Sequence, residues 1–259
     1  MDPHPIGVFD SGIGGLSVVR ALRVVAPGER ILYFADTDWF PYGPRPEAEV
    51  RKRSFAIARR LIDSGCKLIV VACNTASAAA LKDLRDVFPV PFVGMVPGLK
   101  PAASASHHVA VLATPGTLRG ELYSEVERRF ADGTRVEDIS GAGLAELVEH
   151  GNAGTPEARA AVRAALEVAV ARGIDTVVLG CTHYAFLADD IRAELPGLTI
   201  VDTSEAVARH AVNVLEEKGL EAPQDQRGGL DLIVSGDREA FRAAMASVGF
   251  TAEPTGATS

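Results

Sequence analysis

The chain has 259 residues, of which 47% are apolar and 23% are charged, so it can bury a large core and is not a disordered protein. Its 34 acidic residues outnumber its 26 basic residues and give a formal charge of -8, which argues against nucleic acid or an anionic membrane surface as a partner. No segment approaches the roughly 18 to 20 consecutive apolar residues that a transmembrane helix requires. The N-terminus lacks the basic and apolar regions of a signal peptide, so we expect a cytoplasmic protein.

The sequence contains three cysteines, Cys66, Cys73 and Cys181, which are far apart and include no CxxC pair. An odd number at this spacing argues against both a disulfide framework and a zinc knuckle. The histidines show no HxxxH or HExxH pattern. We therefore expect free thiols and no metal site.

Short runs rich in Val and Ile alternate along the chain with longer segments of helical period, which predicts an α/β fold with mainly parallel strands. The predicted strands are 6–9, 30–35, 67–72, 91–95, 109–113, 134–138, 174–180, 199–201 and 230–234. Helices are predicted over 74–87, 144–150 and 156–172, among others. The clearest internal break is at Pro97, Gly98 and Pro101, and it places a domain boundary near residue 98.

Two pairs of segments resemble each other within the chain. Residues 69–76 (IVVACNTA) match 177–184 (VVLGCTHY), and 7–12 (GVFDSG) match 109–116 (VAVLATPG). Two related halves would place equivalent loops at the carboxyl ends of parallel strands, where they face each other across a cleft. A single eight-fold barrel would also gather both cysteines on one face. The two-fold repeat favours two similar domains related by a pseudo-two-fold axis, with the active site in the cleft between them.

Cys73 and Cys181 each end a predicted strand and are followed at once by hydrogen-bonding residues, whereas Cys66 has no such neighbours and is predicted to serve packing. Buried structural thiols are the alternative interpretation of the pair. At the first turn of a helix the dipole favours thiolate over thiol, so we expect lowered thiol pKa values, with Asp10 and His183 as candidate partners.

A charged and a neutral thiol on opposite sides of a cleft can take a proton from one face of a carbon and return one to the other face, which inverts a stereocentre. A cysteine hydrolase would leave the second thiol idle.

The segment 10–15 (DSGIGG) follows the first strand and invites a dinucleotide-binding interpretation, but the third glycine of that motif would fall at Ser17. Its glycines can instead present backbone N–H groups to a substrate carboxylate. The turn 40–45 (FPYGPR) is rigid enough to present Tyr42 and Gly43 to a pocket. Glu149 lies on a predicted helix, where a carboxylate is usually solvated.

Six segments, in order, resemble the glutamate racemase family of the cofactor-independent aspartate/glutamate racemase superfamily. They are GVFDSGIGGLSV (7–18), YFADTDWFPYG (33–43), VACNTASA (71–78), VGMVPGLKPA (93–102), VLATPGT (111–117) and LGCTHY (179–184). The resemblance implies two α/β domains, 1–97 and 98–208, with 209–259 returning to the first. It also implies reversible conversion of L-glutamate to D-glutamate without a cofactor, supply of D-glutamate for bacterial peptidoglycan, and a homodimer.

Carried over to this sequence, the resemblance makes Cys73 and Cys181 the acid/base thiols, with Asp10 assisting the first and His183 the second. Glu149 resembles the family's acidic residue near the second thiol, although 141–147 lacks the expected Cys-Pro. The implied substrate contacts are Asp10, Ser11, Tyr42, Gly43, Asn74, Thr75, Thr114, Thr117, Thr182 and His183.

After Tyr184 the family has Pro-Leu, whereas this chain has Ala185 and Phe186, which we expect to alter packing but not chemistry. Two alternatives stay open at this point. A sister enzyme would act on aspartate or another small acid, and a non-catalytic sensor would bind an acidic amino acid in the same cleft.

Overall fold

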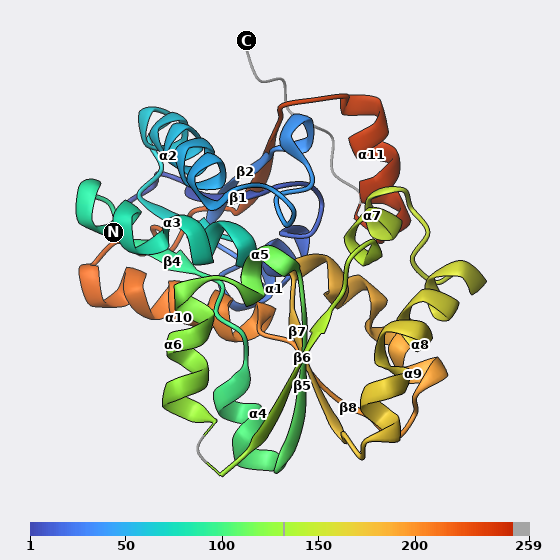
Figure 1. Ribbon diagram of the computed structural model, residues 1–259. Coiled ribbons are helices and arrows are strands. Elements are labelled where there is room, and N and C mark those ends of the chain that lie inside the picture. Colours follow the sequence, from blue (N-terminus) through green and yellow to red (C-terminus); the bar gives the residue numbers. More distant parts are fainter. Residues whose placement is uncertain (132, 251–259) are drawn as a thin grey trace.

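The computed structural model describes residues 1–131 and 133–250, which fold into two parallel β-sheets with helices on both faces (Figure 1). The first sheet has the strand order β4-β3-β1-β2-β9 and the second the order β6-β5-β7-β8. Every strand pair is parallel, as predicted. Two separate open sheets are present, so the barrel alternative is wrong.

Each predicted strand is present in the described part of the chain, with ends that differ from the prediction by at most two residues. The strands are β1 (Ile6–Asp10), β2 (Arg30–Ala35), β3 (Leu68–Val71), β4 (Phe92–Gly94), β5 (His108–Ala113), β6 (Arg135–Ser140), β7 (Thr176–Gly180), β8 (Thr199–Val201) and β9 (Gly229–Val234). The runs were recognisable because β1, β3, β5 and β7 are buried almost throughout, and a strand covered on both faces is a continuous apolar segment.

The helices follow the strands in alternation. They are α1 (Leu16–Val25), η1 (Thr37–Trp39), α2 (Glu47–Asp63), α3 (Asn74–Val87), α4 (Leu99–Ala105), α5 (Pro115–Leu118), α6 (Glu121–Phe130), α7 (Leu144–Glu149), α8 (Pro156–Ala171), η2 (Thr182–Leu187), α9 (Ala188–Glu194), α10 (Ser204–Lys218) and α11 (Arg238–Ser247). None of these described helices is long and apolar enough to cross a membrane.

The two sheets repeat one topology. The order β4-β3-β1-β2 in the first sheet corresponds to β8-β7-β5-β6 in the second, so each strand has its counterpart four strands later. Under this correspondence β3 matches β7 and β1 matches β5, which are the two pairs of similar segments found in the sequence. The prediction of two similar α/β domains is therefore confirmed.

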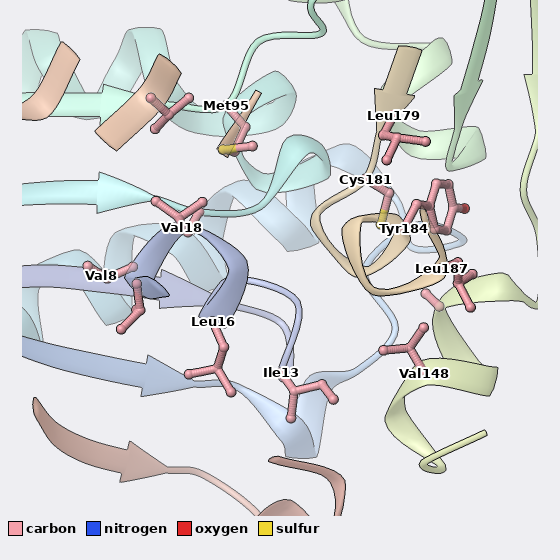
Figure 2. Packing of buried hydrophobic residues seen from close by; sticks show 14 of the residues in the cluster. Val8, Ile13, Leu16, Val18, Met95, Val148, Leu179, Cys181, Tyr184 and Leu187 are labelled. Atoms are coloured by element: carbon pink, nitrogen blue, oxygen red, sulfur yellow. The ribbon is translucent and has the colours of Figure 1, made fainter. Parts of the chain in front are cut away.

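The C-terminal part of the chain returns to the first sheet, where β9 pairs with β2. Residues 251–259, the end of the predicted return segment 209–259, lie outside the described residues. Helix α10 packs along α1, and η2 also contacts α1. A single buried apolar cluster therefore runs from the first domain into the second, with Ile13 and Leu16 on one side and Val148, Tyr184 and Leu187 on the other (Figure 2).

Candidate active site

The loops that follow β1 and β7 meet between the two domains. The Thr182 hydroxyl donates a hydrogen bond to Asp10 Oδ2 at 2.8 Å. The backbone N–H of Ile13 donates to Glu149 Oε1 at 2.6 Å. Because Asp10 and Ile13 come from the first domain and the other two residues from the second, polar contacts join the two domains where the sequence predicted a cleft.

Cys73 follows β3 and caps the N-terminus of α3, in a buried position. Burial and the negative charge of Asp10 raise the pKa of its thiol well above the ordinary value, and the N–H groups of Ala76 and Ser11 offset this only in part. The expectation of a lowered pKa at this helix terminus is wrong for Cys73. Desolvation and a neighbouring carboxylate outweigh the helix dipole here.

Cys181 occupies the counterpart position after β7, but the segment behind it is the 3₁₀ helix η2 rather than an α-helix. Its Sγ lies 3.8 Å from Nδ1 of His183. The other ring nitrogen of His183, Nε2, is hydrogen-bonded to Glu149 Oε1 at 2.6 Å. These three residues form a continuous polar chain that ends at a carboxylate.

The hydrogen bonds of His183 to Cys181 and Glu149 influence the pKa of its ring. Burial by itself lowers the pKa of the imidazole, but the hydrogen bonds to Cys181 and Glu149 and the charge of Asp10 raise it, and the net result is well above the ordinary value. These contacts favour the charged form of the ring over the neutral one. A positively charged imidazole beside a cysteine stabilises the thiolate.

Asp10 is fully buried and accepts hydrogen bonds from the Gly12 N–H at 2.8 Å and from the Ser11 hydroxyl at 3.2 Å, besides that from Thr182. Burial raises the pKa of its carboxyl, and the positive charge of His183 opposes the rise. The resemblance pairs Asp10 with Cys73, but its direct contact across the cleft is to Thr182, next to the second thiol.

The glycines after Asp10 serve a purpose that differs from the predicted carboxylate cradle. The N–H groups of Gly12 and Ile13 bind protein carboxylates. A Cβ at Gly12 would lie 1.8 Å from Glu149 Oε1, and one at Gly14 would lie 2.3 Å from His183 Nδ1. The loop lacks side chains at these positions because the second domain's catalytic candidates occupy the space.

Three threonine hydroxyls form a second contact between the domains. Thr75 Oγ1 at the start of α3 lies 2.8 Å from Thr114 Oγ1 and 3.4 Å from Thr117 Oγ1, and the last two are 3.0 Å apart. A Cβ on Gly43 would lie 3.0 Å from that of Thr114, so the turn 40–45 also reaches this cluster. The structure thus brings these four predicted contact residues together.

Among the predicted contact residues, Asn74 has a buried side chain whose polar atoms make no hydrogen bond within the described residues. Neither Oδ1 nor Nδ2 has a hydrogen-bond partner among the described residues. A buried amide with two free polar atoms is costly unless a ligand satisfies it. A group that both accepts and donates hydrogen bonds would satisfy the two free atoms, which lie directly after Cys73.

Tyr42, also predicted, is buried, and its hydroxyl donates to Asp36 Oδ2 at 2.5 Å. Burial, the charge of Asp36 and the proximity of Cys73 raise its pKa. Sequence reasoning missed Asp36. It also missed Tyr33, whose hydroxyl donates to the Gly12 carbonyl at 2.6 Å, and Phe40, whose ring centre is 5.5 Å from that of His183.

The positions that depart from the expected family pattern, Phe186 and the 141–147 segment, both have contacts to other parts of the protein. Phe186 packs on the guanidinium of Arg20, 5.7 Å from its ring centre. The Tyr184 hydroxyl donates to the Gly141 carbonyl at 2.7 Å and ties the 141–149 segment to η2. In the described residues no cluster of three or more His, Cys, Asp or Glu side chains is arranged to hold a metal ion.

Comparisons with known proteins show which family the chain resembles. A family model described as Asp/Glu/hydantoin racemase matches residues 16–211. A glutamate racemase from Deinococcus radiodurans is 46% identical over 258 residues, which cover 98% of this chain and 88% of that protein.

Two solved structures have the same fold over nearly their whole length. Glutamate racemase from Thermus thermophilus, in complex with β-chloro-D-alanine, has a TM-score of 0.85 and 41% identity, with 98% of this chain and 96% of that chain covered. Escherichia coli glutamate racemase, in complex with L-glutamate and the activator UDP-MurNAc-Ala, has a TM-score of 0.83 and 35% identity, with 96% of each chain covered. The chain therefore belongs to the Asp/Glu/hydantoin racemase family, as an amino-acid racemase similar to the glutamate racemases.

Proposed function

We propose that this protein interconverts L-glutamate and D-glutamate, with Cys73 and Cys181 as the acid and base on opposite faces of the α-carbon. The names of its relatives and the L-glutamate bound to the Escherichia coli enzyme support glutamate as the substrate. The observation that carries the mechanism is the pair of thiols at counterpart strand ends in opposite electrostatic surroundings.

In the proposed cycle Cys73 starts as the neutral thiol and serves as the acid, and Cys181, beside the His183 imidazole, serves as the base. The Cys181 thiolate removes the α-hydrogen of one enantiomer as a proton, and the electron pair of the C–H bond stays on the α-carbon. Cys73 then donates its proton to the other face of that carbon. After one turnover the protonation states of the two thiols are exchanged, and proton exchange with water or a reverse turnover restores them.

Substrate binding uses the polar groups that the free protein leaves open or shares between domains. A free amino acid carries a carboxylate that can accept from Asn74 Nδ2 and an ammonium that can donate to Asn74 Oδ1. The hydroxyls of Thr75, Thr114 and Thr182 offer further donors from both domains. A non-catalytic sensor is disfavoured because it has no use for two thiols so placed.

The two thiols supply both the acid and the base, so we propose that the reaction needs no cofactor. D-glutamate made in this way would supply peptidoglycan synthesis in the cytoplasm, and we propose a homodimer as the working form. These three statements rest on the family resemblance and on the chemistry of the thiols.

The direct test is loss of the circular dichroism signal of L-glutamate mixed with the purified protein, without pyridoxal phosphate and in the presence of EDTA. We expect complete racemisation of L-glutamate and little change in an equal concentration of L-aspartate. Racemisation of L-aspartate alone would assign the chain to the sister activity. Activity that EDTA abolishes and a metal restores would contradict the cofactor-free mechanism.

A further inference from the structure

A buried ion pair lies directly behind the turn that carries Tyr42. Asp36, which follows β2, is fully buried, whereas the side chain of Arg53 on α2 is 25% exposed. Arg53 donates to both carboxylate oxygens, from Nε to Oδ2 at 2.8 Å and from Nη2 to Oδ1 at 2.5 Å. This is the bidentate fork geometry, in which an arginine fixes the plane of a carboxylate.

The same carboxylate holds Tyr42. Its Oδ2 accepts the Tyr42 hydroxyl at 2.5 Å, so one oxygen receives both the guanidinium and the phenol. The hydrogen bond to Asp36 raises the pKa of Arg53, which keeps the guanidinium charged. A buried carboxylate that lost this partner would be left with an uncompensated charge and would release or reorient the phenol.

The turn held by Tyr42 touches the second domain. The Arg45 N–H closes the turn on the Tyr42 carbonyl at 3.0 Å. A Cβ on Gly43 would approach that of Thr114 to 3.0 Å, and one on Gly116 would approach the Gly43 carbonyl oxygen to 2.8 Å. The turn therefore fits against the threonine cluster with little clearance, and a displacement of Tyr42 would move the turn relative to Thr114 and Gly116.

We propose that Arg53 is a positioning residue for substrate binding: through Asp36 it locks Tyr42, and with it the turn at 42–45, in the place where the cleft closes on the amino acid. The inference rests on the proposed function, because it takes this cleft to be the glutamate site. Because Arg53 acts through Asp36 and Tyr42, we expect its effect to fall on substrate affinity more than on the proton transfers.

The chain offers a matched control and a built-in reporter. Arg59 lies on the same helix and stacks on Phe88, 4.9 Å from its ring centre, much as Arg53 stacks on Trp39 at 5.1 Å. Only Arg53 of the two pairs with Asp36. Trp39 is the single tryptophan of the chain, so its fluorescence reports the turn without interference.

Arg53→Gln is expected to raise KM for L-glutamate about tenfold with kcat changed less than about threefold, and to change Trp39 emission, since a network of buried hydrogen bonds acts as a unit. Arg53→Lys keeps the positive charge but not the bidentate hydrogen bonds, so its increase in KM should be smaller than that of Arg53→Gln. Arg59→Gln should leave both parameters and the emission unchanged. Far-UV circular dichroism shows whether Arg53→Gln folds. If it folds poorly, the double variant Asp36→Asn with Arg53→Gln, which has no uncompensated buried charge, is used in its place.

A double-mutant cycle decides whether Arg53 acts through Tyr42. The KM of Tyr42→Phe with Arg53→Gln should be close to that of Tyr42→Phe alone, because the second substitution then removes a support that no longer holds anything. An unchanged KM in Arg53→Gln, or a full additional rise in the double variant, would overturn the proposal. Absence of racemisation in the wild-type protein would refute the proposed function instead, while the Trp39 emission would still report whether Arg53 orders the turn.

Discussion

The carboxyl ends of β3 and β7 occupy equivalent places in two sheets of the same topology, and each is followed by a buried cysteine. Their surroundings differ in charge. Cys73 is buried near the carboxylate of Asp10, which raises the pKa of its thiol, whereas Cys181 Sγ lies 3.8 Å from Nδ1 of His183. The comparison teaches that the repeated fold supplies the two positions, while neighbours that are not repeated give the two thiols different electrostatic surroundings.

The largest expected effect comes from removing either member of the pair. Cys73→Ala and Cys181→Ala should each lower kcat for L-glutamate by about 10³-fold or more, because each removes one obligatory proton carrier. Cys66→Ala is the control, since this thiol, whose pKa burial raises to about 12, packs against Gly7 at the other end of the sheet. A single alanine variant of the pair that folds and keeps several per cent of activity would break the comparison.

The second effect targets the Cys181 side through the backbone of the first domain. Gly14→Ala should lower kcat about 100-fold, because the added methyl group would lie 2.3 Å from His183 Nδ1 and displace the ring from Cys181. Gly197→Ala, where nothing lies within 4 Å of the new Cβ, should be silent. Full activity in Gly14→Ala would mean that the contact between His183 and Cys181 is dispensable.

The third effect targets the Cys73 side. Asn74→Ala should raise KM about tenfold while leaving the melting temperature of the free protein nearly unchanged, because the amide makes no hydrogen bond there that could be lost. Steady-state kinetics and thermal unfolding measure the two quantities. A large loss of stability with an unchanged KM would assign Asn74 to the scaffold instead of to the substrate.

The smallest effect is a displacement of the pH profile. We expect kcat/KM to be bell-shaped, with an alkaline limb set by loss of the His183 proton. Glu149 raises the pKa of His183, so Glu149→Gln should lower that pKa and move the alkaline limb to lower pH. Glu146→Gln, on the same helix, is the matched control and should leave the limb in place. Movement of the limb to higher pH would contradict the assigned charge of His183.

The sequence predicted the strands and the place of both cysteines at strand ends, because buried parallel strands are continuous apolar runs whose ends can be recognised. It could not predict the direction of the Cys73 pKa. That direction depends on desolvation and on Asp10, whose carboxylate is held by Thr182 from the other domain.

Long-range packing also explains what else was missed. In the sequence, Gly12 and Gly14 resemble a ligand-binding loop. The structure shows instead that Glu149 and His183 pack against them and leave no space for a side chain. The ion pair of Asp36 and Arg53 could not be recognised from the sequence, because it joins a strand end to a helix through tertiary structure alone.

The most direct test of the two-thiol account follows the hydrogen at the α-carbon. L-glutamate is incubated with the protein in D₂O, the reaction is stopped at low conversion, and the enantiomers are separated on a chiral column and weighed by mass spectrometry. Because the thiol that delivers the proton is not the one that removed it and has exchanged with solvent beforehand, nearly all D-glutamate should carry deuterium at Cα and the remaining L-glutamate almost none. Early D-glutamate that kept its original hydrogen would show that one base serves both faces and would contradict the assignment of separate roles to Cys73 and Cys181.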